Sequence, residues 1–106
     1  MRKLVIVLTA LLMTISHQYL AAEEFVVGQK NKEFTVKSLD IKVGDTVKFE
    51  NQDPFFHNVF SLSEIKTFDL GSFKQGKSKT VTFDKPGKVD VECAIHPNMH
   101  MTIEVK

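Results

Sequence analysis

KVDVECAIHPNMHMTIEV, from Lys88 to Val105, is the stretch that decides the fold of this 106-residue chain. Both of its ends alternate apolar and polar residues with a period of two, which is typical of half-buried β-strands. Between the two expected strands lies a short loop that holds the chain's one cysteine, Cys93, together with His96 and Met99. The stretch therefore predicts a hairpin whose loop brings a thiolate, an imidazole and a thioether towards one soft metal ion.

The same alternation continues upstream, where short apolar-polar segments are separated by glycine-containing turns. The expected strand segments are EFTVKSL (33–39), DTVKFEN (45–51) and KTVTFD (79–84). The turn signals are VGD (43–45), LGS (70–72), KQGK (74–77) and KPGK (85–88). Several short strands at this spacing predict a small all-β domain, a Greek-key β-sandwich or barrel. Only SLSEIKTFDLGSF (61–73) lacks a clear pattern, and it fits a loop, a short helix or an irregular strand.

The first 22 residues have the pattern of a secretory signal peptide. Arg2 and Lys3 precede the apolar stretch LVIVLTALLMTI (4–15), and a small-residue exit ends at Ala22. The apolar stretch is shorter than the roughly 20 residues that a membrane-spanning helix needs. We therefore expect cleavage after Ala22, export to the periplasm, and one domain that comprises residues 23–106.

Charge and cysteine content narrow the possible functions. The whole chain has 14 basic and 13 acidic side chains. Without Arg2 and Lys3, residues 23–106 keep 14 − 2 = 12 basic and 13 acidic side chains, a net charge of −1, so there is no basic excess for nucleic acid or anionic lipid. A single cysteine in an exported chain has no internal disulfide partner. A metal ligand is therefore a natural role for Cys93.

A second imidazole must come from another part of the chain. His57 lies in PFFHNVF (54–60), before an apolar run, where it fits the mouth of a strand. Two histidines, one cysteine and a weak axial methionine form the trigonal blue-copper ligand set. Structural zinc sites generally use several thiolates, and this chain offers only one.

These motifs resemble those of the cupredoxins, particularly amicyanin, plastocyanin and pseudoazurin. The resemblance rests on HNV (57–59) and CAIHPNM (93–99), with PGKVDVEC (86–93) leading into the second motif. It implies one type 1 copper per chain and a role in single-electron transfer, without enzymatic activity. The ligands that it implies are His57, Cys93, His96 and Met99. Asn58 is similar to the residue that ties the two ligand loops together in the family.

The axial ligand has an alternative. Met101 gives the spacing C-x2-H-x4-M, which also occurs in the family. However, Met101 shares its parity with Ile103 and Val105, so it is expected on the core face of a strand. We therefore prefer Met99 and keep Met101 as the alternative.

The neighbours of His96 suggest where electrons leave. Its ring edge is expected at the surface, and Ala94, Ile95 and Pro97 around it would form a small apolar patch. Transient redox complexes use small interfaces, so this patch suits brief docking of redox proteins to a monomer whose exported domain is not inserted in a membrane.

Three other functions remain open. The same ligands would serve a periplasmic copper-handling or tolerance protein, to which the surplus His100 and Met101 give some support. A copper enzyme would need additional histidine-rich copper sites, and only His100 is left over. A metal-free adhesion sandwich is the third possibility.

Overall fold

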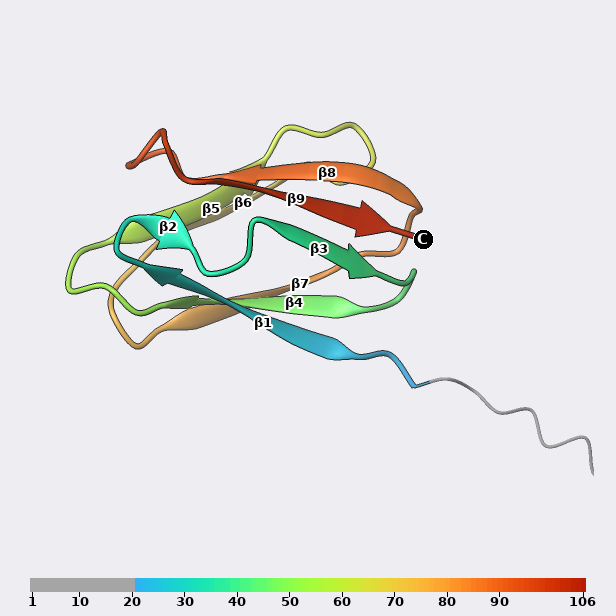
Figure 1. The fold of residues 1–106 in the computed structure, drawn as a ribbon, viewed down its shortest axis with the longest axis horizontal. Helices are drawn as coiled ribbons and strands as arrows, with labels where there is room; N and C mark the ends of the chain where they lie inside the picture. Colours follow the sequence, from blue (N-terminus) through green and yellow to red (C-terminus); the bar gives the residue numbers. More distant parts are fainter. Residues whose placement is uncertain (1–20) are drawn as a thin grey trace, which may run out of the picture.

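Two β-sheets pack against each other in the computed structural model, which describes residues 21–106 (Figure 1). Nine strands are found within these residues. They are β1 (Glu24–Lys30), β2 (Glu33–Phe34), β3 (Ser38–Ile41), β4 (Thr46–Asn51), β5 (His57–Ser61), β6 (Phe68–Phe73), β7 (Ser78–Thr82), β8 (Gly87–Glu92) and β9 (His100–Val105). The predicted signal peptide falls almost wholly outside the described residues.

The strand order is that of a β-sandwich. One sheet has the order β2-β1-β4-β7 and the other the order β3-β9-β8-β5-β6. β1 runs parallel to β4 and β3 runs parallel to β9, whereas the remaining pairs are antiparallel. The prediction of a small all-β sandwich is therefore confirmed. No helix within residues 21–106 has the length and apolarity that crossing a membrane requires.

The core sits between the two sheets, as the alternation predicts. In β4 every second residue is buried, and β9 repeats this pattern with Met101, Ile103 and Val105. Across the hairpin, Val91 lies opposite Met101 and Val89 lies opposite Ile103. Each fully buried side chain of this size contributes about 1.5–3 kcal/mol relative to exposure. This packed hairpin is the rigid base on which the Cys93–Met99 loop stands.

The segment EFTVKSL does not form one continuous strand. β2 ends at Phe34, and β3 begins at Ser38 in the opposite sheet. The chain crosses between the layers over residues 35–37 because β2 pairs with β1 while β3 pairs with β9. Phe34 is buried but Val36 is only partly buried, so the expected shared face ends at the crossover.

The ambiguous segment 61–73 contains an irregular strand. β6 pairs with β5, and the register shifts between Asn58 and Phe60. The turn signal at 70–72 is wrong, since Gly71 lies inside β6 with a φ of 71°. Gly44 and Gly76, in contrast, do occupy turns between strands.

Candidate metal centre

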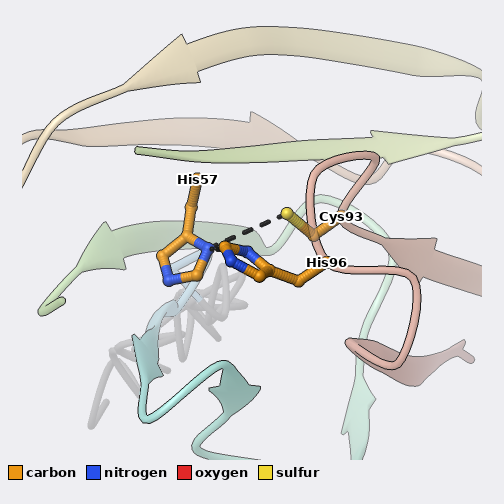
Figure 2. A group of neighbouring side chains, drawn as sticks. All are labelled: His57, Cys93 and His96. Atoms are coloured by element: carbon orange, nitrogen blue, oxygen red, sulfur yellow. Dashed lines mark hydrogen bonds between the residues drawn. The ribbon is translucent and has the colours of Figure 1, made fainter. Parts of the chain in front are cut away.

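Two neighbouring parts of one sheet supply the predicted ligands. His57 begins β5, whereas Cys93 and His96 lie in the loop between β8 and β9. β5 and β8 are adjacent and antiparallel, with Phe60 paired to Glu92, so the start of β5 extends past the end of β8 and lies beside the ligand loop. Figure 2 shows the His57 and His96 rings next to each other, with the Cys93 sulfur beside them.

The three ligand atoms are close enough to share one ion. His57 Nδ1 lies 3.2 Å from His96 Nδ1 and 3.8 Å from Cys93 Sγ, and all three atoms lie within 4.8 Å of one another. Two nitrogens that each lie about 2 Å from an ion are at most about 4 Å apart, and a nitrogen and a sulfur at most about 4.3 Å. The two separations from His57 Nδ1 are below these limits. Within residues 21–106, this is the one such cluster of His, Cys, Asp or Glu side chains.

Burial differs among the three ligands. His57 and Cys93 are 0% and 1% exposed, whereas His96 is only partly buried and lies between exposed neighbours. Burial lowers the pKa of the His96 imidazole, and positive charge on His57 and Lys32 acts in the same direction. A lowered pKa keeps the ring neutral, so its nitrogen lone pair is available to a cation.

The ligand loop is closed by its own backbone. The Met99 N–H donates to the His96 carbonyl at 2.9 Å, and the Cys93 N–H donates to the Met99 carbonyl at 3.3 Å. Met99 and Met101 are 1% and 0% exposed, so burial does not distinguish the two methionines. Their positions differ, because Met99 lies in the loop before β9 whereas Met101 lies on the buried face of β9.

Asn58 connects the two ligand-bearing segments, as the resemblance implied. Its side-chain oxygen accepts the Ala94 N–H at 3.1 Å, and its amide nitrogen donates to Asp69 Oδ1 at 3.0 Å. Its backbone N–H points at Cys93 Sγ, 3.5 Å away. A hydrogen bond to the ligand sulfur is one of the features that set the potential of a thiolate copper site.

Sequence reasoning missed Asp53. Its carboxylate Oδ2 lies 2.7 Å from His57 Nε2, on the opposite side of the ring from the cluster. Burial raises the pKa of the Asp53 carboxyl, but hydrogen bonds from His57, Lys32 and Asn31 outweigh it and the net pKa lies below the ordinary value. The available signal was an acidic residue four positions before a ligand histidine.

Phe55 packs against the site. Its ring centroid lies 5.3 Å from that of His57 and 5.2 Å from that of His96. Phe55 is 36% exposed and Phe56 is 57% exposed, so the Phe55 ring covers the ligand rings only in part. Ala94, Ile95 and Pro97 are exposed beside His96, and Asn98 is exposed next to them.

Comparisons with known proteins agree with this geometry. Residues 21–106 match the family of copper binding proteins, plastocyanin/azurin family. The methylamine utilization protein MauL of Methylorubrum extorquens is 32% identical over 88 residues, covering 80% of this chain and 75% of that protein. The Cu(I) structure of a methionine-to-alanine mutant of amicyanin has a TM-score of 0.73 and 26% identity, covering 78% of this chain and 82% of amicyanin.

A larger copper protein contains a similar domain. The copper-containing nitrite reductase NirK of Thermus scotoductus has a TM-score of 0.73 and 30% identity over 78% of this chain. The match covers only 22% of that enzyme. The resemblance therefore concerns one domain and does not extend to the whole enzyme.

A two-sheet sandwich with one buried thiol and two converging imidazoles defines a small copper-binding protein of the type 1 class. This chain belongs to the plastocyanin/azurin family of copper binding proteins, as its sequence motifs predicted. The cofactor that the family and the donor set indicate is copper.

Proposed function

We propose that this protein carries single electrons between redox partners, with one type 1 copper held by His57, Cys93, His96 and Met99. The observation that carries the proposal is that His57 Nδ1 lies 3.2 Å from His96 Nδ1 and 3.8 Å from Cys93 Sγ. Copper in such a ligand set supplies a one-electron Cu(II)/Cu(I) couple. MauL and amicyanin, as similar proteins of the same family, support this function over that of an enzyme.

The protein fold fixes the positions of the ligands and buries two of them away from water. His57 is fully buried at the start of a strand, and Cys93 is anchored by the packed β8–β9 hairpin. The Asn58 side chain accepts a hydrogen bond from the Ala94 N–H, and this bond ties β5 to the ligand loop. A site fixed in this way changes little between oxidation states, which favours rapid electron transfer.

His96 is the proposed exit for electrons. It is the only ligand of the three in the cluster that is not fully buried, and Ala94, Ile95 and Pro97 expose an apolar surface around it. Redox proteins that dock briefly use small patches of this kind. We propose such transient partners for a monomeric protein in the periplasm, with residues 1–22 as the signal peptide and 23–106 as the copper domain.

The test is the electron self-exchange rate of the copper-loaded protein, measured by NMR line broadening in mixtures of the oxidised and reduced forms. We expect a reversible potential and rapid exchange. Ile95→Asp places a charge on the patch and should slow the exchange, whereas Leu62→Asp, an exposed apolar position outside the ligand loop, should have little effect. Slow exchange in the wild type would contradict the proposal.

Copper handling by the same site is the alternative, and the structure weakens its support. Met101 is fully buried on the face of β9 that packs into the hydrophobic core. His100 is exposed and its Nε2 lies 3.5 Å from Asp90 Oδ1. Within the described residues, His100 does not belong to the ligand cluster. Expression of the protein under copper stress would favour handling, whereas expression with its redox partners would favour transport of electrons.

A further inference from the structure

The second nitrogen of the buried ligand His57 has a charged partner. Asp53 Oδ2 lies 2.7 Å from His57 Nε2, and both side chains are buried, at 4% and 0% exposure. A deprotonated carboxylate only accepts hydrogen bonds, so Nε2 carries the proton. The other nitrogen, Nδ1, is then left with a free lone pair, and it is this atom that faces Cys93 and His96.

The Asp53 carboxylate is itself held in place by two backbone N–H groups. The backbone N–H groups of Asn31 and Lys32 donate to its two oxygens, at 2.8 Å and 3.0 Å. The backbone N–H of Asp53 donates to Asn51 Oδ1 at 2.8 Å and fixes the main chain at this position. The carboxylate therefore has no freedom to turn away from His57.

The β1–β2 turn is shaped to make these contacts. Asn31 and Lys32 form its two central residues and have φ values of 55° and 58°, the left-handed conformation that non-glycine residues rarely adopt. Two successive N–H groups in such a turn point the same way and form an anion-binding concavity. A turn more than 20 residues upstream thus fixes the partner of a metal ligand.

We propose that Asp53 is a positioning residue of the metal centre: through its carboxylate it fixes the tautomer and orientation of His57 and favours the oxidised state of the bound metal. This rests on the proposed copper function. A carboxylate bonded to a ligand imidazole raises its basicity, and losing such a partner costs about 10- to 100-fold in metal affinity or activity. A buried negative charge this close also stabilises Cu(II) over Cu(I), which carries one positive charge less.

The first test needs no copper. Nitrogen-15 NMR of the metal-free wild-type protein reports which ring nitrogen of each histidine carries the proton. We expect His57 as the Nε2–H tautomer, with a downfield and slowly exchanging Nε2 proton. An Nδ1–H tautomer would overturn the proposal. This result is independent of whether the protein carries electrons, so it stands or fails separately from the proposed function.

The second test compares two carboxylates. Asp53→Asn removes the charge next to His57, and Asp45→Asn is the matched control. Asp45 is also buried and also accepts two backbone N–H groups, from Glu23 and Lys42, but it lies at the opposite end of β4 and contacts no histidine. Both variants should lose stability.

Only Asp53→Asn should raise the midpoint potential and weaken Cu(II) binding, by about 10-fold or more. The same potential in both variants would contradict the proposal, as would an unchanged Cu(II) affinity in Asp53→Asn. If Asp53→Asn does not fold, the tautomer of the wild-type His57 decides.

Discussion

At the scale of single residues, two buried methionines compete for the axial position. Met99 lies in the closed ligand loop, and its backbone bonds to both His96 and Cys93. Met101 lies opposite Val91 on β9, where its neighbours along the strand are core residues. Both side chains belong to the buried core, so the preference for Met99 rests on its place in the ligand loop and stays a prediction.

Substituting the two methionines separates these roles. Met99→Gln replaces a soft sulfur by a harder oxygen, which favours Cu(II), so the potential should fall while copper is retained. Met101→Leu conserves volume and should cost less than about 1.5 kcal/mol of stability without moving the potential. The measurements are cyclic voltammetry and chemical denaturation. A shift for Met101→Leu with none for Met99→Gln would make Met101 the axial ligand.

The partly exposed His96 should make the potential depend on pH. Burial and nearby positive charge lower its pKa, so protonation begins below the ordinary histidine value of about 6.5. Protons compete better with Cu(I) than with Cu(II) for the ring, so the reduced form gains a proton and the potential rises as the pH falls. A potential that stays flat from neutral pH into mild acid would argue against a dissociating His96.

At the scale of elements, the site depends on β5 and the β8–β9 loop keeping their register. Asn58 provides this link, because its side chain spans from β5 to Ala94 in the loop and to Asp69 in β6. A buried donor left without a partner costs about 1–3 kcal/mol. We therefore expect the Asn58 side chain to contribute to the stability of the fold through these hydrogen bonds.

Asn58→Ala should lower the free energy of unfolding by about 1–3 kcal/mol and also perturb the visible spectrum, since the loop loses its anchor. Asp69→Ala is the control, because it removes the bond from Asn58 and the exposed bond from the Gly71 N–H but leaves the bond between Asn58 and Ala94 intact. Urea denaturation and absorption spectroscopy measure both effects. Equal losses in the two variants would show that Asn58 does not hold the ligand loop.

Much of the strand pattern and most of the site follow from local sequence. β4, β8 and β9 alternate with a period of two because each buries one face. Cys93, His96 and Met99 were identifiable from spacing, since one short loop holds them.

Other features of the fold and the site could not be predicted from local sequence patterns. β1 pairs in parallel with β4, and the crossover at 35–37 depends on which sheet each strand joins. Asp53 was missed because its role depends on the Asn31–Lys32 turn, far away in the sequence. Both features are set by tertiary contacts, which alternation and motif spacing do not report.

At the scale of the whole molecule, acid stability should depend on carboxylates that join distant segments. Asp45 accepts the N–H groups of Glu23 and Lys42, so it holds the start of β1 against the turn before β4. These hydrogen bonds lower the pKa of the Asp45 carboxyl. A carboxyl whose pKa is lowered by folding stabilises the folded state above its ordinary pKa, and this stability disappears as the pH falls through the lowered value.

The metal-free protein should therefore have a constant contribution from Asp45 above about pH 5 and lose it progressively below about pH 4. Asp45→Asn should be less stable than the wild type at neutral pH, and the difference should shrink in acid. Urea denaturation from pH 3 to pH 7 measures this. A difference that is the same at both ends of this range would show that the charge on Asp45 is not responsible.

The central claim is that the thiolate of Cys93 and two imidazoles hold a type 1 copper, and the visible absorption spectrum of the Cu(II)-loaded protein tests it most directly. The account predicts one copper per chain and an intense thiolate-to-Cu(II) charge-transfer band. Cys93→Ala should abolish this band, because the thiolate is the electron donor in the transition. A copper-loaded wild-type protein that shows only weak ligand-field bands would contradict the assignment.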